Sequence, residues 1–133
     1  MRKNILITGG AGFIGSNLAE ELVKENNVVA IDNFITSDVA NIEDLLRNPH
    51  FEFLNHDLTK PIDLSTFKEL SKFNLKTQGI SAIYHLACPT SPKDYDRIPI
   101  ETALTNAYGA RNVLDLALKY QAVYVLGSTG FIY

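Results

Sequence analysis

The sequence predicts an α/β fold built around a doubly wound parallel sheet with strand order 3-2-1-4-5. Two features of the chain support this prediction. Short apolar runs alternate with longer amphipathic segments along the whole chain, and the first apolar run leads directly into a glycine-rich turn. Alternating strands and helices form right-handed crossovers, which produce a parallel sheet that is covered on both faces.

Five apolar runs are predicted to form the strands. Each run is continuously apolar rather than alternating, as expected for strands whose two faces are both buried. The runs cover residues 4–8, 27–31, 51–55, 81–86 and 122–126. The strand order reverses between the first and fourth strands, and ligands bind at the carboxyl ends of strands beside such a reversal.

Four amphipathic segments are predicted to form the helices. The first has Ile14, Leu18 and Leu22 at helical spacing, and the second ends before Pro49, where a helix is disfavoured. The segments cover residues 13–25, 37–47, 62–72 and 99–119. Because a domain usually has about 100–200 residues, a single domain over residues 1–133 is expected.

The composition excludes several classes of protein. Hydrophobic residues make up 46% of the chain and charged residues 20%, which is typical of a globular domain. The net charge of −3 argues against a nucleic-acid-binding surface. No apolar run approaches the roughly 20 residues that cross a membrane. Cys88 is the single cysteine, which excludes an intramolecular disulfide and favours a cytoplasmic location. The three histidines lack the spacing of metal ligands, so no metal site is expected.

The glycine-rich turn is the first candidate binding site. Its pattern is Gly-x-x-Gly-x-x-Gly, formed by Gly9, Gly12 and Gly15 between a predicted strand and a predicted helix. Gly9 allows a sharp turn, Gly12 lets backbone approach a diphosphate, and Gly15 allows close packing of the helix. The helix N-terminus offers free N–H groups and a partial positive charge to an anion. The alternative interpretation is a tight turn that binds no ligand.

Asp32 is the second candidate. It ends the second predicted strand, twenty positions after Gly12, where a carboxylate accepts hydrogen bonds from the hydroxyls of an adenosine ribose. A 2′-phosphate would be repelled, by about 4 kcal/mol per unit charge at about 4 Å and an effective dielectric constant of about 20. No lysine or arginine within residues 33–37 offsets this repulsion, so the predicted cofactor is NAD rather than NADP. The alternative is that Asp32 ends the strand as a helix cap.

Asp57 follows the third predicted strand in the same way. A carboxylate at this position is placed to accept a hydrogen bond from the adenine amino group. The alternative is an aspartate that only forms a turn.

These motifs together resemble the extended short-chain dehydrogenase/reductase family. Its members are NAD-dependent nucleotide-sugar epimerases, dehydratases and decarboxylases. Within the family, the segment His-Leu-Ala-Cys-Pro-Thr-Ser-Pro at residues 85–92 is most similar to the UDP-glucuronate decarboxylases. The resemblance also rests on Thr8 to Gly15, Asp32-Asn33-Phe34, His56-Asp57-Leu58, Tyr84-His85-Leu86-Ala87, Thr105-Asn106 and Ser128-Thr129.

The resemblance implies a role for each group of residues. Tyr95 and Asn106 are expected near a UDP-sugar substrate, and Thr129 matches a catalytic hydroxyl residue that bonds the C4 oxygen of the sugar. The residues expected to contact NAD are Gly9, Gly12, Phe13, Ile14, Gly15, Asp32, Asn33, Thr36, Asp57, Leu58, Leu86, Ala87 and Cys88.

The sequence departs from the family at the catalytic residues. The family uses a tyrosine base in a Tyr-x-x-x-Lys motif, and no tyrosine in these 133 residues has a lysine four positions later. Leu104 replaces a lysine and Phe131 a glutamate of the decarboxylases. The later strands and the C-terminal substrate lobe of the family are also absent from the sequence.

Three interpretations follow from these departures. The chain is the NAD-binding portion of a nucleotide-sugar enzyme that is inactive alone, one half of a two-chain enzyme, or a non-catalytic NAD-binding module. Family members pair through two helices, of which residues 99–119 would supply one. Self-association through this helix and through an open sheet edge is therefore expected.

Overall fold

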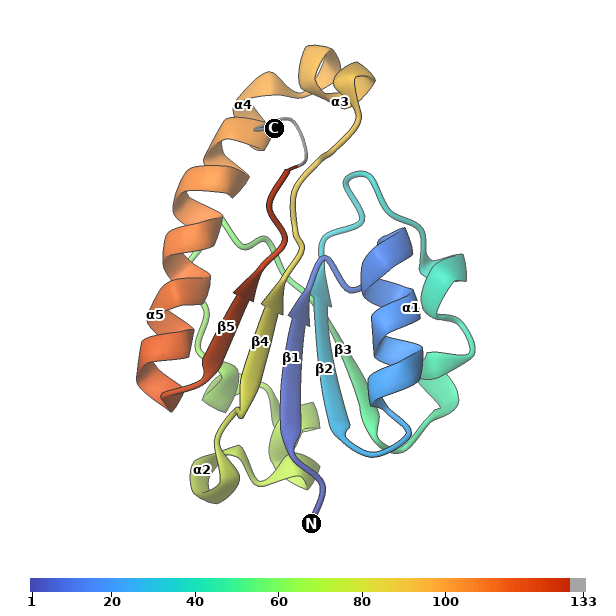
Figure 1. Cartoon of the computed structure of the whole chain (residues 1–133), viewed down its shortest axis with the longest axis vertical. Coiled ribbons are helices and arrows are strands. Elements are labelled where there is room, and N and C mark those ends of the chain that lie inside the picture. Colours follow the sequence, from blue (N-terminus) through green and yellow to red (C-terminus); the bar gives the residue numbers. More distant parts are fainter. Residues whose placement is uncertain (130–133) are drawn as a thin grey trace.

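A computed structural model of the chain describes residues 1–129 and confirms the predicted sheet. Five parallel strands are arranged in the order β3-β2-β1-β4-β5 (Figure 1). Their bounds are β1 Asn4–Thr8, β2 Asn27–Asp32, β3 Phe51–Asn55, β4 Ala82–His85 and β5 Val123–Leu126. The strand order and all five strand positions therefore agree with the sequence-based prediction.

The strand register brings the carboxyl ends of the strands to one edge of the sheet. Thr8 at the end of β1 pairs with Ile31 of β2 on one side and with His85 of β4 on the other. Asp32 pairs with Asn55 at the end of β3. The loops that leave these strands therefore emerge side by side, and the reversal of strand order lies between β1 and β4.

Side chains on the two faces of the sheet form two separate apolar layers. On one face, Leu6, Val29 and Ile83 are fully buried in a cluster that includes side chains of α5 (Ala110–Tyr120) and of the segment between β3 and β4. On the other face, Ile7 and Val28 are fully buried under α1 (Phe13–Leu22). Figure 1 shows α1 and α5 on opposite sides of the sheet. The continuously apolar strands are explained by this double coverage.

Helix α1 ends earlier than the predicted residue 25. It ends at Leu22, and the following residues make tighter turns in which the Lys24 N–H donates to the carbonyl of Glu21. The Arg2 guanidinium donates to the carbonyls of Val23, Asn26 and Lys24 at 2.9, 3.1 and 3.0 Å. An arginine from outside the helix thus satisfies carbonyls that the helix end leaves without partners.

The predicted helices over residues 37–47 and 62–72 are wrong. The first segment contains two short 3₁₀ turns, η1 (Val39–Ile42) and η2 (Leu45–Arg47), and the second contains η3 (Leu64–Thr66) and the beginning of η4 (Lys68–Phe73). The physical reason lies in the period of burial. Buried or packed side chains recur every three residues in both segments, and a 3₁₀ helix places such positions on one line. They are Ile42 and Leu45 in the first segment and Leu64, Phe67, Leu70 and Phe73 in the second.

The long predicted helix over residues 99–119 is present as one helical run with a widened centre. It comprises α4 (Pro99–Leu104), the π-helical turn η5 (Thr105–Gly109) and α5. Two short helices, α2 (Leu75–Gln78) and α3 (Pro92–Arg97), were not predicted.

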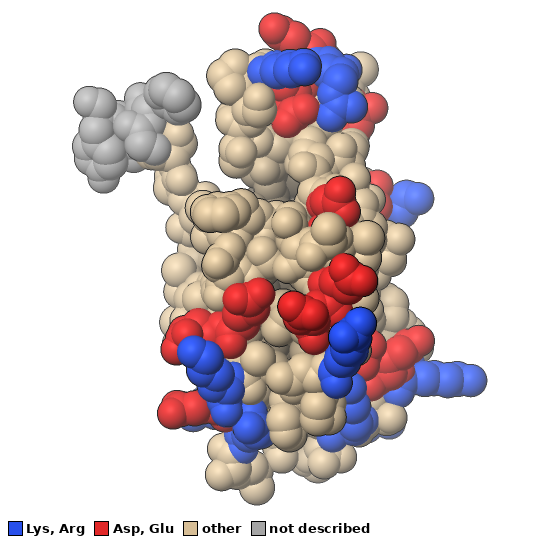
Figure 2. Space-filling model, turned by 90° about the vertical axis from the view of Figure 1, so that its right-hand side faces the viewer, with Lys and Arg blue, Asp and Glu red and all other residues tan. Residues whose placement is uncertain are grey.

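The charged side chains on one face of the molecule are mixed in sign. Figure 2 shows acidic and basic side chains interspersed on one face, with no extended basic region among the described residues seen there. Within residues 1–129, no helix is long and apolar enough to span a membrane.

Candidate functional site

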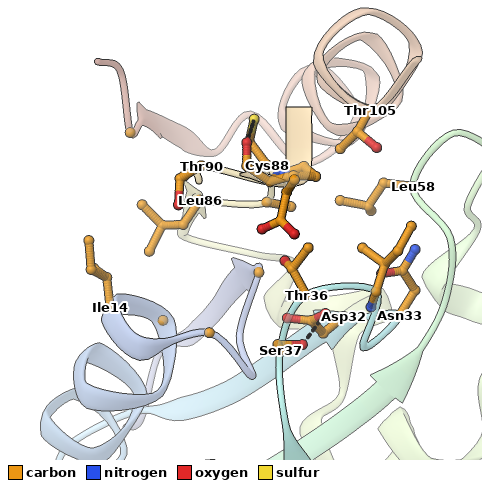
Figure 3. A pocket seen from close by; sticks show the side chains of 18 of the residues that line it. Ile14, Asp32, Asn33, Thr36, Ser37, Leu58, Leu86, Cys88, Thr90 and Thr105 are labelled. Carbon is orange, nitrogen blue, oxygen red and sulfur yellow. Dashed lines mark hydrogen bonds between the residues drawn. The ribbon is translucent and has the colours of Figure 1, made fainter. Parts of the chain in front are cut away.

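A cleft of about 580 Å³ lies at the carboxyl ends of the strands (Figure 3). Its volume is within the usual range of about 300–1,000 Å³ for sites that hold small molecules and cofactors. Ile14 lies at the left of the view, and Asp32, Asn33 and Ser37 lie at the lower right. Every residue predicted to contact NAD lines the cleft: Gly9, Gly12, Phe13, Ile14, Gly15, Asp32, Asn33, Thr36, Asp57, Leu58, Leu86, Ala87 and Cys88.

The glycine turn forms the floor of the cleft, and two of its glycines are required by geometry. Gly9 has a φ of +72°, and a Cβ there would lie 2.8 Å from the backbone carbonyl of Leu86. A Cβ on Gly15 would overlap the backbone oxygen of Gly9. The turn therefore passes between β4 and α1 with no room for a side chain at either position.

The N-terminus of α1 is open towards the cleft. Gly12 is the N-cap residue of α1 and has no side chain to cap it, and the first turn of α1 contains no acidic residue. The Gly12 N–H donates to the carbonyl of Gly9 at 3.1 Å, and the Ser16 N–H donates to the carbonyl of Gly12 at 2.9 Å. Phe13 and Ile14 are 81% and 66% exposed, so their side chains do not pack over the helix end. Uncapped N–H groups with this orientation favour an anion such as a diphosphate.

Asp32 ends β2, and its carboxylate accepts three hydrogen bonds. Oδ1 accepts from the Phe34 N–H at 3.0 Å and from the Ser37 hydroxyl at 2.8 Å. Oδ2 accepts from the Ala11 N–H at 3.0 Å, which joins the glycine turn to the end of β2. Both interpretations of Asp32 thus have a structural basis, because the carboxylate organises nearby backbone and also borders the cleft.

Asp57 also lines the cleft, but its hydrogen bonds are those of a turn. Oδ1 accepts from the N–H of Thr59 at 2.9 Å and from the Thr59 hydroxyl at 2.8 Å. Leu58 beside it is 5% exposed and contributes an apolar surface to the cleft. The turn-forming alternative accounts for these contacts, and the predicted contact with adenine stays a prediction.

The opposite wall of the cleft is formed by residues that follow β4. Leu86, Ala87 and Cys88 line it, and the Cys88 thiol donates to the carbonyl of Pro89 at 3.0 Å. Beneath this wall, His85 is 4% exposed, with Nδ1 2.6 Å from the hydroxyl of Thr8. Burial lowers the pKa of His85, which favours the neutral imidazole. The contact between Thr8 and His85 therefore joins β1 to β4 directly below the glycine turn.

Three predicted site residues do not line the cleft within the described part of the chain. Tyr95 in α3 is 40% exposed, and the Asn106 side chain donates to the carbonyl of Thr102 at 3.0 Å. Thr129, the predicted catalytic residue, is exposed. In each case an adjacent residue lines the cleft instead, namely Asp94, Thr105 and Ser128. The predicted roles of the three therefore stay predictions.

The cleft also contains residues that the sequence analysis did not select. His56, to which the sequence analysis assigns no contact, also borders the cleft. Five of the other lining residues lie in segments that carry the family resemblance, which assigned them no contact: Pro89, Thr90, Ser91, Thr105 and Ser128. None of those segments contains Ile35, Ser37, Asp94 or Gly127. Among residues 1–129, no group of histidine, cysteine or acidic side chains could hold a metal ion.

The sheet topology and the cleft at its reversal point define a Rossmann-type α/β protein. The family model described as GDP-mannose 4,6 dehydratase matches residues 6–133. The chain therefore belongs to this family of NAD-dependent epimerases and dehydratases.

Known relatives agree with this assignment. UDP-glucuronic acid decarboxylase 1 of Arabidopsis thaliana is 40% identical over 133 residues, which cover 99% of this chain and 27% of the relative. An epimerase structure from Methanothermobacter thermautotrophicus superposes with a TM-score of 0.75 at 30% identity, over 97% of this chain and 36% of that chain. The UDP-glucose-4-epimerase structure from Stenotrophomonas maltophila, with bound NAD, has a TM-score of 0.76 at 25% identity, over 99% and 38%.

The chain spans only part of these proteins. It covers between 26% and 34% of the length of the curated decarboxylases that it matches. What the complete relatives do is therefore a hypothesis for this chain.

Proposed function

We propose that the chain is the NAD-binding portion of a nucleotide-sugar enzyme of the UDP-glucuronate decarboxylase type. One observation supports this proposal above the others. The uncapped N-terminus of α1 and the carboxylate of Asp32 border the same cleft, so N–H groups suited to a diphosphate and an acceptor suited to a ribose lie in one site. A dinucleotide that carries a diphosphate and a free adenosine ribose has both complementary groups.

The residues of the cleft fit NAD. The N–H groups at the start of α1 would bind the diphosphate, and Asp32 would accept hydrogen bonds from the adenosine ribose. Leu58 offers an apolar surface to the adenine ring, and Leu86 and Cys88 border the opposite side, where the nicotinamide would lie. When bound, NAD supplies a hydride acceptor for C4 of the sugar and returns the hydride at the end of the cycle.

The proposed substrate is a nucleotide sugar, in keeping with the names of the relatives. A UDP-sugar would lie beyond the nicotinamide side of the cleft, near Tyr95, Asn106 and Thr129. Of these, we assign Thr129 a hydrogen bond from its hydroxyl to the C4 oxygen of the sugar, which would orient the reacting carbon.

These 133 residues alone are proposed to bind NAD without turning over substrate. They contain no tyrosine with a lysine four positions later, so the usual base of the family is missing from them. Two alternatives keep the same cofactor site. One is a non-catalytic NAD-binding module, which is favoured by Leu104 and Phe131 because the decarboxylases have a lysine and a glutamate at these positions. The other is an enzyme completed by a second chain.

Calorimetric titration of the chain with NAD and NADP tests the proposal. NAD should bind more tightly than NADP, because the carboxylate of Asp32 repels a 2′-phosphate. The Asp32→Ala variant should bind NAD roughly tenfold or more weakly, as expected for the loss of a hydrogen bond to a charged group. Unfolding curves of both proteins would verify that the variant is folded. Preference for NADP, or equal NAD affinity in a folded variant, would contradict the proposal.

A further inference from the structure

We propose that Ser37 is a positioning residue that orients the carboxylate of Asp32 towards the adenosine ribose. The inference rests on the proposed function and adds a residue to it. Ser37 lies five positions beyond Asp32 and lines the same cleft. Figure 3 shows the hydrogen bond from its hydroxyl to Asp32, which measures 2.8 Å to Oδ1.

The arrangement of donors leaves one part of the carboxylate available. A carboxylate has about four acceptor positions, two on each oxygen. Among residues 1–129, Oδ1 accepts from the Phe34 N–H and from Ser37, whereas Oδ2 accepts only from the Ala11 N–H. The free acceptor position is therefore on Oδ2, which makes this oxygen the acceptor for a ribose hydroxyl.

Ser37 is needed for this orientation because the Asp32 side chain does not determine it alone. The last torsion of an aspartate is broad and roughly two-fold, so the plane of the carboxylate is set by its hydrogen bonds. Ser37 and the Phe34 N–H hold Oδ1, and the Ala11 N–H holds Oδ2. Without the serine hydroxyl, one of the two donors on Oδ1 is lost and the plane can rotate.

The loop that carries Ser37 is held by other contacts. Phe34 adopts a φ of +58°, and its ring packs against Phe53 with centroids 5.0 Å apart. The Ile35 N–H donates to Oδ1 of Asn33 at 3.2 Å. These contacts do not involve the serine hydroxyl, so its removal should change the orientation of Asp32 more than the course of the loop.

The test compares NAD affinity in Ser37→Ala, Ser37→Thr and the parent chain by calorimetry. Ser37→Ala should bind NAD about three- to tenfold more weakly, the fold-change of one net hydrogen bond. Ser37→Thr keeps a hydroxyl and should restore affinity to within about twofold of the parent. Ser65→Ala is the matched control, since the Ser65 hydroxyl also donates to an aspartate, Oδ1 of Asp63 at 2.8 Å, outside the cleft. It should bind NAD as the parent does.

Two further measurements separate positioning from a general structural effect. Ser37→Ala should weaken the binding of ADP but not of 2′,3′-dideoxy-ADP, which lacks the hydroxyls that Asp32 would bind. In an Asp32→Asn background, adding Ser37→Ala should cause little further loss, because the serine acts through the carboxylate.

Several outcomes would overturn the inference alone. These are unchanged or tighter NAD binding by Ser37→Ala, equal weakening of ADP and its dideoxy analogue, or a Ser37→Ala chain that no longer folds. A parent chain that binds no NAD would instead overturn the proposed function, and the inference with it.

Discussion

Asp32 combines an observed structural role with a position that suits the proposed contact with an adenosine ribose. From the sequence, its position favours either a ribose acceptor or a structural cap. The structure shows that its carboxylate joins the glycine turn, through Ala11, to the loop after β2, through Phe34 and Ser37. A carboxylate that is held on both oxygens is preorganised for a ligand, so the structural contacts support the binding role rather than replace it.

Substitution of Gly15 is predicted to lower both the stability of the chain and its NAD binding. Gly15→Ala places a methyl group against the backbone oxygen of Gly9, and a backbone atom in a turn flanked by β4 cannot move aside. We expect a loss of about 1–3 kcal/mol in the free energy of unfolding, the usual cost of overpacking, together with weaker NAD binding. Urea unfolding and calorimetry measure the two effects.

Gly109→Ala is the control for this substitution. Gly109 has helical φ and ψ angles of −60° and −47°, and a Cβ there would lie 3.5 Å from the nearest atoms, an ordinary contact. Alanine in a helix is about 0.5–1 kcal/mol more favourable than glycine, so this variant should be as stable as the parent or more stable. Equal stability of the Gly15→Ala chain and the parent would show that the turn is not tightly packed.

At the scale of elements, the strands and the helical runs α1 and α4–α5 are predictable from the sequence, whereas the segments that join β2 to β3 and β3 to β4 are not. Five continuous apolar runs that alternate with helical segments specify a parallel sheet. The topology of the sheet then determines where the loops meet. The 3₁₀ turns were missed because a three-residue period, as in Leu64, Phe67, Leu70 and Phe73, resembles part of a helical pattern until the burial of each position is known.

The same distinction applies to the candidate site. Residues whose chemistry depends on position in a motif, such as Gly9 and Asp32, were found from spacing alone. Ser37 and Asp94 have no motif, and only the path of the loops after β2 and β4 brings them to the cleft. Thr105 reaches the cleft at η5, where the helical run widens into a π-helical turn. Such widening is common at functional sites but has no sequence signal of its own.

The contact between β1 and β4 through Thr8 and His85 predicts a pH dependence of stability. Burial lowers the pKa of His85 below its ordinary value of 6.5, so the folded chain resists protonation while the unfolded chain does not. The contribution to stability is complete above pH 6.5 and is lost as the pH falls below it. The loss approaches at most about 1.4 kcal/mol per pH unit, the value for one proton. Urea unfolding between about pH 5 and 8 measures it.

Substitution isolates this effect from the other titrating groups. His85→Gln removes the ionisable group and should flatten the decline in stability between pH 6.5 and 5, whatever its effect at pH 8. His50→Gln removes a histidine whose Nδ1 contacts Oδ1 of Asn27 at 3.0 Å, away from the cleft, and should retain the decline. A decline of the same steepness in His85→Gln and in the parent would rule out the assignment.

At the scale of the whole molecule, the two faces of the sheet differ in how completely helices cover them. One face is covered by α5 across β4 and β5, where Tyr124 packs against the core. On the other face, α1 packs over β1 and β2. At the β5 end of the sheet, which α1 does not reach, Val123 and Val125 are 65% and 41% exposed. Within the described residues, no element covers these two valines, and β5 is the last strand of the sheet.

This asymmetry predicts that the 133-residue chain associates with itself. Besides Val123 and Val125, the outer side of the helical run exposes Ile100, Tyr108 and Leu118, the last by 77%. Apolar surface of this extent and an unpaired strand edge both favour contacts between chains. The mass from light scattering should therefore rise with concentration. Leu118→Glu should lower it if the helical run is involved, and Val123→Lys should lower it if the strand edge is involved.

The control and the contradicting result follow from the same geometry. Val39→Glu changes a valine in η1 that is 51% exposed and belongs to neither the helical run nor β5, so it should leave association unchanged. Dimers that respond only to Leu118→Glu would assign association to the helices, whereas a response only to Val123→Lys would assign it to the open edge. A single monomeric mass at all concentrations would show that these apolar side chains are tolerated in water, because isolated exposed apolar residues need no partner.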